Sequence, residues 1–247
     1  MFSRFLSALL LLAALPLHAK ELRVCAEPDN LPYSHADENG FENRIARLLA
    51  DELQATLLYA WALQRRAFVR KSAGTCEVFI GVPTGFERLS TTKPYYRSSY
   101  VFVSRARLSS FAELKDLRVG VQLVGDDMAA TPAGHGLAAH GIVKNVVGFT
   151  VYGERPAAQR MVEAIAANQL DAAVVWGPAV GWFAAAKNLP VTPAPKPDSV
   201  PVPFQFAIAV GVRRGHKELR DQLERALVAR KDDIGRILDE YRVPRLP

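Results

Sequence analysis

The pattern of apolar and polar positions changes from strand-like to helical near residue 40. A short apolar run at residues 22–26 is followed by a loop that contains Pro28 and Pro32. Apolar residues then recur at helical spacing over residues 41–53, where they share one face. This order predicts a strand, a loop and an amphipathic helix, which is a typical opening unit of an α/β sheet.

The same alternation of strand-like and helical segments continues along the chain. Helices are expected at 68–73, from Gly125 onward, at 157–167 and in two segments that close the chain. Residues 189–203 are rich in proline and are expected to form a surface excursion. Further strands are expected at residues 56–61, 77–82, 116–121, 143–149, 171–176 and 206–212.

The order of these elements predicts two α/β lobes. The first would contain residues 20–103 together with 205–247, and the second residues 104–204. Two extended segments, at 100–104 and 204–210, are placed to cross between the lobes. Two lobes joined by two crossing strands make a hinged clamshell, a fold that closes on ligands by hinge motion.

The first 19 residues have the layout of a secretory signal peptide. They contain one basic residue, Arg4, no acidic residue, and an apolar run from Phe5 to Leu17 that ends shortly before Ala19. A membrane anchor is the alternative, but the run is shorter than the roughly 20 residues that span a bilayer. Cleavage after Ala19 and export to the periplasm are therefore expected, with no stable insertion in the membrane afterwards.

The remaining chain has two cysteines, Cys25 and Cys76, each in a strand-like run. An exported protein meets an oxidising compartment, where a pair of cysteines usually forms a disulfide. If the two strands are neighbours, the bridge is geometrically easy. A redox or metal-binding pair is the alternative, but nothing resembles C-x-x-C, so a structural disulfide is favoured.

Charge and motifs narrow the function. The formal net charge is +6, or +5 without the leader, and the basic residues form no dense block. Such a mild excess can steer acidic partners, whereas nucleic acid is implausible outside the cytoplasm. No nucleophile, base and orienting group can be assembled, and no metal or nucleotide motif is present, so we expect neither catalysis nor a cofactor.

The loop after the first strand is the leading candidate for a ligand site, because α/β sheets bind ligands at the carboxyl ends of their strands. Asp126 and Asp127, at an expected helix start, could contact a ligand or simply cap the helix. Tyrosines near the first crossing could line a pocket or pack in the core. Candidate lining residues are Asp29, Asn30, Tyr33, Arg65, Thr84, Tyr95, Tyr96, Tyr100, Gln122, Asp126, Asp127 and Trp176.

Seven blocks in the same order carry a resemblance to a known family. They are RVCAEPDNLPYS, GFENRIARLLADEL, QRRAFVR, GVPTGFER, KPYYRSSYVFV, RVGVQLVGDD-x3-TP and AAVVWGPAVGWFA. The chain resembles the type II periplasmic solute-binding proteins, and within them the MxaJ/XoxJ family. The resemblance implies a periplasmic clamshell that binds and assists a pyrroloquinoline-quinone-dependent alcohol dehydrogenase, with its c-type cytochrome as a further partner.

The chain also departs from the amino-acid binders of that superfamily. Those proteins usually hold the ligand carboxylate with an arginine after the third strand and the ammonium with an acidic residue of the second lobe. Arg88 lies in the region of the arginine, but its spacing to Pro94 is short, and Trp176 stands where the acid is expected. The alternative function, a solute-binding protein that delivers a small polar metabolite such as an amino acid to an ABC permease, therefore lacks its usual anchors.

Overall fold

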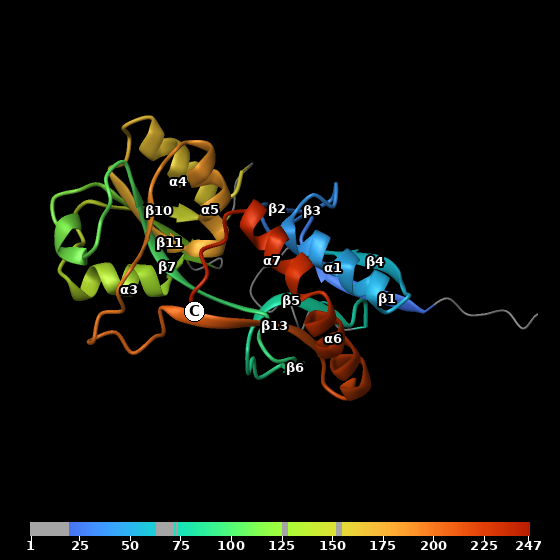
Figure 1. The fold of residues 1–247 in the computed structure, drawn as a ribbon. Coiled ribbons are helices and arrows are strands. Elements are labelled where there is room, and N and C mark those ends of the chain that lie inside the picture. Colours follow the sequence, from blue (N-terminus) through green and yellow to red (C-terminus); the bar gives the residue numbers. More distant parts are fainter. Residues whose placement is uncertain (1–19, 63–71, 73, 125–127, 152–154) are drawn as a thin grey trace, which may run out of the picture.

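The computed structural model describes residues 20–62, 72, 74–124, 128–151 and 155–247. They form two α/β lobes joined by two long strands, β7 (Tyr96–Ser104) and β13 (Gln205–Arg213) (Figure 1). The expected α/β clamshell with two crossing strands is therefore confirmed. The expected signal peptide and the helix at 68–73 lie outside the described residues, apart from Ser72. None of the helices in the described part is long and apolar enough to cross a membrane.

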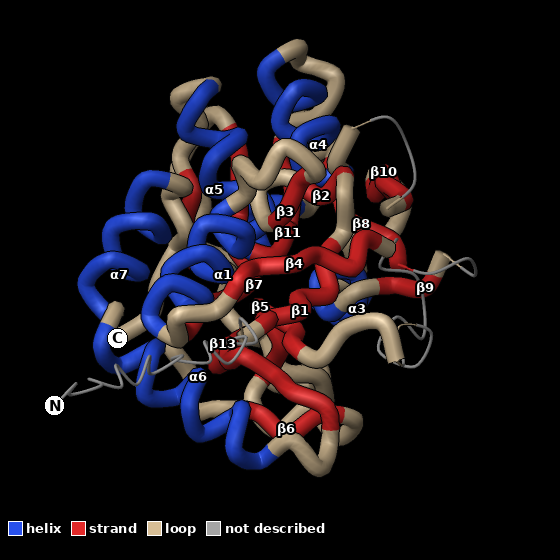
Figure 2. The backbone as a smooth tube through the Cα atoms, turned by 90° about the vertical axis from the view of Figure 1, so that its right-hand side faces the viewer, coloured by secondary structure: helices blue, strands red, loops and turns tan. Residues whose placement is uncertain are grey.

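The first lobe has three parallel strands, in the order β4 (Thr56–Trp61), β1 (Glu21–Ala26) and β5 (Val78–Pro83). β13 runs antiparallel beside β5 and also pairs with β6 (Leu89–Thr91). Three amphipathic helices, α1 (Phe41–Glu52), α6 (Lys217–Ala229) and α7 (Lys231–Glu240), lie together on one side of these strands (Figure 2). Their apolar stripes and the facing strand residues form one buried cluster, as a helix-covered sheet requires.

The second lobe repeats this arrangement. Its parallel strands are β10 (Val146–Thr150), β8 (Val119–Val124) and β11 (Ala172–Trp176), with β7 antiparallel beside β11. β12 (Val191–Pro193) pairs with β7, and β9 (Ala129–Ala130) pairs with β8. The short 3₁₀ helix η1 (Phe111–Leu114) and α3 (Pro132–Ala139) pack against one face, and α4 (Ala157–Ala166) and α5 (Gly177–Ala186) against the other.

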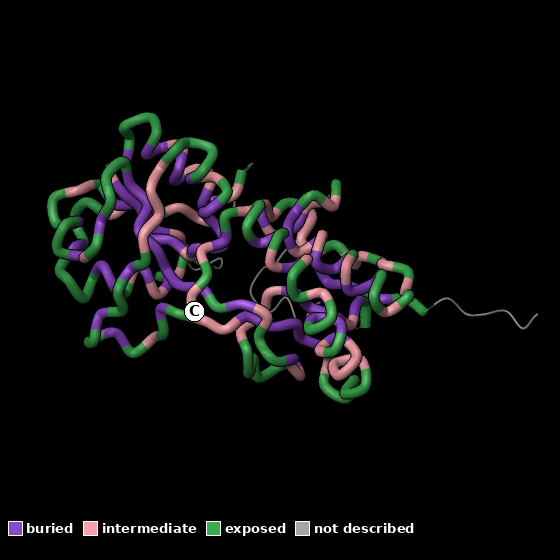
Figure 3. The backbone as a smooth tube through the Cα atoms, in the orientation of Figure 1, coloured by how far each residue is buried: buried purple, intermediate pink, exposed green. Residues whose placement is uncertain are grey.

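Side-chain alternation explains why this second sheet is covered on both faces. In β7, Phe102 packs into the cluster beneath α3, whereas Val101 and Val103 pack into the cluster beneath α4 and α5. In β11, Val174 packs into the cluster beneath α3 and Val175 into the cluster beneath α4 and α5. Successive residues of a strand point to opposite faces, so a continuous apolar run predicts a sheet buried on both sides. Figure 3 shows the buried residues following the strands of both lobes.

Some expected elements differ from those observed. α5 was not expected, because it is apolar on nearly all sides and so lacks the polar face that makes a helix recognisable in a sequence. The helix expected from Gly125 onward begins instead at Pro132, after the β8–β9 hairpin. The proline-rich segment is not only a surface excursion, since Ala194 and Val200 are buried in the second lobe. β4 matches its expected range of 56–61, and the ends of the other expected strands differ from the observed ones by at most three residues.

Cys25 and Cys76 form a disulfide, with a Cα–Cα distance of 5.4 Å, as expected from the oxidising compartment. β1 pairs with β5, so the two strands are neighbours. The disulfide packs with Phe79 and Leu89 in a small cluster on the face of the first sheet opposite α1. It therefore adds a covalent link on the face where the described residues provide the least apolar packing.

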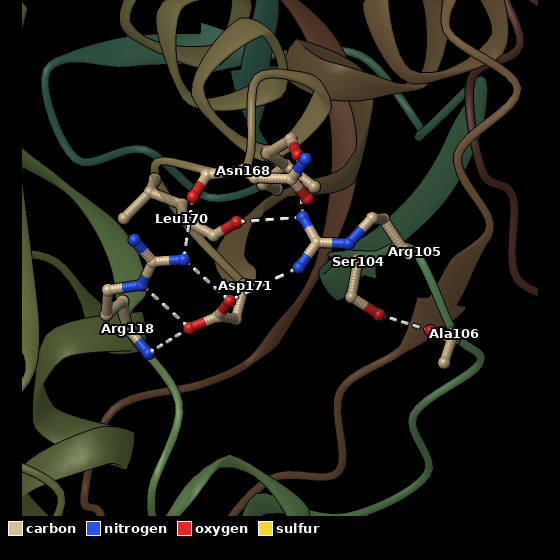
Figure 4. A network of polar contacts seen from close by, with 8 residues as sticks. Ser104, Arg105, Ala106, Arg118, Asn168, Leu170 and Asp171 are labelled. Atoms are coloured by element: carbon tan, nitrogen blue, oxygen red, sulfur yellow. Dashed lines mark hydrogen bonds and ion pairs between the residues drawn. The ribbon is translucent and has the colours of Figure 1, made fainter.

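An ionic network centred on Asp171 closes the second lobe at the start of β11 (Figure 4). The Asp171 carboxylate accepts hydrogen bonds from the Arg118 backbone N–H at 2.9 Å and from its guanidinium at 2.9 and 3.0 Å. Arg105 donates to the same carboxylate at 3.2 Å and to the carbonyls of Ile165 and Leu170. The Arg118 side chain lowers the pKa of Asp171 well below its usual range. This network fastens the end of β7 to the start of β8.

Replacing both cysteines by alanine should lower the free energy of unfolding by about 4 kcal/mol, because the closed loop spans 51 residues and its loss frees the unfolded chain. Urea titration of the double variant against the oxidised protein measures this. Wild type with reductant is the matched control and should behave like the double variant. An unchanged midpoint in both would contradict the expectation.

Asp171→Asn should destabilise the protein by about 1–2 kcal/mol at pH 7, since Arg118 is half exposed and water screens the pair. The folded-state pKa of Asp171 is depressed, so its stabilisation is present above about pH 4 and is lost as the pH falls. The difference from wild type in urea midpoints should therefore shrink between pH 6 and pH 3. The control is Asp116→Asn, at an exposed aspartate two residues before Arg118. It should change neither the stability at pH 7 nor the pH dependence of the urea midpoint.

Candidate functional site at the junction of the lobes

The loop after β1 folds into a small hairpin, β2 (Asp29–Asn30) and β3 (Ser34–His35), that caps α1. The carbonyls of Pro32 and Tyr33 accept the backbone N–H groups of Phe41 and Glu42, both at 2.8 Å. These bonds satisfy two of the N–H groups that a helix leaves unpaired at its start. A side chain at Gly40 would clash with the Tyr33 carbonyl, since an added Cβ would lie 2.1 Å from its oxygen. The hairpin is thereby held against the first turn of α1.

This contact places Glu42 beside the carboxyl-terminal part of β5. Its carboxyl group lies against the backbone of Gly81, where an added Cβ would lie 1.9 Å from Oε1. Gly81 also has a φ of +79°, a conformation that strains any residue with a side chain. Burial raises the pKa of Glu42 to about 8, even though the N-terminus of a helix favours negative charge.

Several tyrosines lie near Glu42. Tyr33, Tyr95 and Tyr96 all lie close enough to Glu42 for its charge to raise the pKa of their hydroxyls, although burial is the larger cause in each case. Tyr100 acts in the same way on Tyr33. Among the described residues, the Tyr95 hydroxyl is buried without a hydrogen-bond partner. A carboxyl group and several phenols therefore lie close to one another near the start of the first crossing strand.

Trp176 lies where the two lobes meet. Its ring contacts those of Tyr100, at 5.5 Å between centroids, and Phe206, at 5.4 Å, both edge to face. Trp176 packs against the buried clusters of both lobes, and Tyr33 packs against two of them. An indole in this position contributes packing between the lobes rather than a charge for a ligand.

The C-terminal segment makes a third connection between the lobes. After α7 it passes α5 and ends beside β7 (Figure 1). The Ser98 hydroxyl donates to the Pro244 carbonyl at 2.6 Å, and the Leu246 N–H donates to the Arg97 carbonyl at 2.9 Å. Two glycines of α5 permit the close approach, because a Cβ at Gly181 would lie 2.0 Å from the Arg242 carbonyl oxygen.

The structure brings only some of the sequence candidates together. Tyr33, Tyr95, Tyr96, Tyr100 and Trp176 gather at the junction of the lobes. Asp29 and Asn30 belong to the hairpin, and the exposed Thr84 donates its hydroxyl to the Ala207 carbonyl at 3.0 Å. Gln122 lies in β8, where its carbonyl accepts a bond from Thr131. Arg65, Asp126 and Asp127 lie outside the described residues.

Glu42 was missed as a site residue in the sequence. In the sequence, Glu42 is an acidic residue in the first turn of an amphipathic helix, a position where acidic residues are common. The available signal was its place immediately after the strand-end loop, but only the fold reveals that Gly81 and the tyrosines enclose it. No cluster of three or more metal-ligating side chains occurs among the described residues.

The fold and this junction place the chain in the class of periplasmic binding proteins. The crystal structure of the periplasmic binding protein XoxJ from Methylobacterium extorquens AM1 matches with a TM-score of 0.76 and 34% identity, over 92% of this chain and 99% of that one. MxaJ from Methlophaga aminisulfidivorans MPT matches with a TM-score of 0.79 and 25% identity, over 91% and 100%.

The particular family follows from the sequence identity. Protein MoxJ of Paracoccus denitrificans is 33% identical over 250 residues, which cover 92% of this chain and 89% of that protein. No protein-family model matches the chain. The chain belongs to the MoxJ family, together with MxaJ and XoxJ, and the resemblance found in the sequence blocks is confirmed.

The close packing of α5 against the C-terminal segment can be tested with two glycines. Gly181→Ala should cost about 1–3 kcal/mol, because its Cβ would overlap the Arg242 carbonyl. The matched control is Gly235→Ala in α7, where the nearest atom is 3.7 Å from the added Cβ. That change should stabilise by about 0.5–1 kcal/mol, because alanine favours helix. Equal thermal unfolding temperatures for both variants would contradict the contact.

Proposed function

We propose that the chain is a periplasmic accessory protein that binds and assists a pyrroloquinoline-quinone-dependent alcohol dehydrogenase of methanol oxidation. The observation that carries the proposal is the identity to MoxJ and XoxJ over more than nine tenths of the chain. The quinone belongs to the dehydrogenase, and the chain itself acts by binding. Export through residues 1–19 would deliver it to the same compartment as its partner.

Two features of the chain support this role over solute delivery. Trp176 stands where the amino-acid binders place an acidic anchor, and its ring is engaged in packing between the lobes. The C-terminal segment links α7 to α5 and β7, which adds contacts that must slide or break if the lobes open widely. A binding protein with restrained lobes presents a pre-organised surface to a protein partner, which reduces the cost of association.

The basic excess also suits a protein partner. A net charge of +5 without the leader raises the rate of encounter with an acidic protein at low ionic strength. The c-type cytochrome of the same system is a second expected partner.

Co-purification from the periplasm of the native host tests the proposal. A C-terminally tagged chain should retain the dehydrogenase, and deleting the gene should lower dehydrogenase activity in periplasmic extracts several-fold. The wild-type gene should restore that activity. The matched control is a variant that lacks residues 1–19, which should stay in the cytoplasm and restore nothing.

If the dehydrogenase neither co-elutes with the tagged chain nor loses activity when the gene is deleted, the accessory role is wrong. Co-elution of a permease and its ATPase instead would favour the solute-binding alternative.

A further inference from the structure

The carboxyl group of Glu42 lies at the junction among described residues that do not stabilise its ionised form. Its backbone N–H donates a hydrogen bond to the Tyr33 carbonyl, but the described residues provide no basic group that acts on its carboxyl. The surroundings are dense enough to desolvate the carboxyl, yet the residue as a whole keeps intermediate exposure. Glu42 is thus poorly solvated by water, although the described residues do not enclose the residue completely.

The Tyr95 hydroxyl is an unsatisfied polar group near the same place. It is buried, and within the described chain no group meets hydrogen-bond geometry with it, although the Gly81 backbone lies nearby. A buried polar group without a partner costs about 1–3 kcal/mol. The unpartnered Tyr95 hydroxyl and the desolvated Glu42 carboxyl both lie near Gly81, so this part of the junction offers two polar groups to an occupant.

We propose that Glu42, with the Tyr95 hydroxyl and the faces of the neighbouring tyrosines, binds the ammonium or guanidinium head of an organic cation at the junction of the lobes. The cation would supply the charge that the carboxyl lacks and would donate hydrogen bonds to its oxygens. Aromatic rings near the head add cation–π attraction. Gly81, without a side chain, gives the carboxyl room to lie against its backbone and so positions it beside the tyrosines.

Other ligand classes fit these residues less well. Ca²⁺ takes six or more oxygen ligands, usually with several carboxylates, whereas the described residues offer no cluster of three metal-ligating groups. An anion would be repelled by ionised Glu42. A neutral ligand would leave the carboxyl as costly to ionise as before.

Binding of a cation should release a proton. The titratable groups that Glu42 acts on are Tyr33 in the hairpin, Tyr95 just before β7, Tyr96 at the start of β7, and Tyr59 in β4. Tyr59 is also influenced by Glu38 and Arg47. All four phenols stay neutral below pH 9, because burial raises the pKa of each hydroxyl. Glu42 is therefore the group whose ionisation governs binding between pH 6 and pH 8.

The probes are butylammonium and butylguanidinium chloride, which carry the two head groups on the same apolar stem. 1-Butanol is the uncharged control, and sodium chloride balances the ionic strength. Titration of the purified exported chain, followed by NMR, should give a dissociation constant for a charged probe that falls about tenfold from pH 6 to pH 7 and levels off above pH 8. The better of the two probes identifies the head group.

Glutamate carboxyl ¹³C resonances provide a readout that needs no binding. One resonance should titrate near pH 8 in the free protein, should be absent in Glu42→Gln, and should move to lower pH with the probe. Glu42→Gln should weaken probe binding at least tenfold at pH 8 and remove its pH dependence. Asp51→Asn, at an exposed acid of the same helix, is the matched control and should leave binding unchanged.

Tyr95→Phe separates ligand binding from folding. Because the hydroxyl lacks a partner in the free protein, its removal should leave the unfolding midpoint unchanged or slightly raised, while probe binding weakens several-fold. A clear loss of stability would show that the hydroxyl serves the fold instead.

Three results would overturn the proposal: a Glu42 carboxyl that titrates at its ordinary pH, a titration that neither probe shifts, or undiminished binding by Glu42→Gln. The first would mean that water or a basic side chain already stabilises the ionised acid. These measurements use the purified chain alone and do not rest on the proposed partnership. A failed cation site would leave the dehydrogenase proposal intact, and the reverse also holds.

Discussion

The antiparallel pairing of β7 with β13 is the interaction on which the rest of the architecture depends. Residues 96–99 of β7 pair with 205–208 of β13, and each strand then continues into a different lobe. β7 continues beside β11, whereas β13 continues beside β5. Because one continuous ladder of strand pairing extends into both lobes, the position of each sheet is defined relative to the other. The aromatic residues that flank this pairing, Tyr100, Trp176 and Phe206, contact one another at the junction.

The two lobes reach stability by different means around this common ladder. The second lobe covers both faces of its sheet with apolar elements, and the ionic network of Asp171 closes its far end. The first lobe has three helices on one face, and the disulfide and a small apolar cluster on the other. Covalent linkage is a reasonable substitute for burial in an exported protein, because the oxidising compartment maintains it.

The junction combines packing and chemistry in a way that fits a binding protein. Trp176 and Tyr100 contribute edge-to-face contacts between the lobes, and the C-terminal segment adds backbone hydrogen bonds to β7. In contrast, the Tyr95 hydroxyl has no hydrogen-bond partner among the described residues, and the Glu42 carboxyl is desolvated without a basic group beside it there. Stable proteins seldom retain such groups without a use, so the contrast separates the structural part of the junction from its candidate ligand-binding part.

The sequence by itself determined the α/β class and the two-lobed order, because strand and helix periods and their order can be read along the chain. It also determined the family through the seven matching blocks, and the cysteine pairing because the sequence contains two cysteines. It predicted the junction tyrosines as a group but could not find Glu42, and it missed α5 because that helix lacks a polar face. Only the tertiary structure decided which groups are left unsatisfied. Burial and hydrogen-bond partnership depend on residues far apart in the chain, such as Glu42, Gly81 and Tyr95, and no local pattern records their meeting.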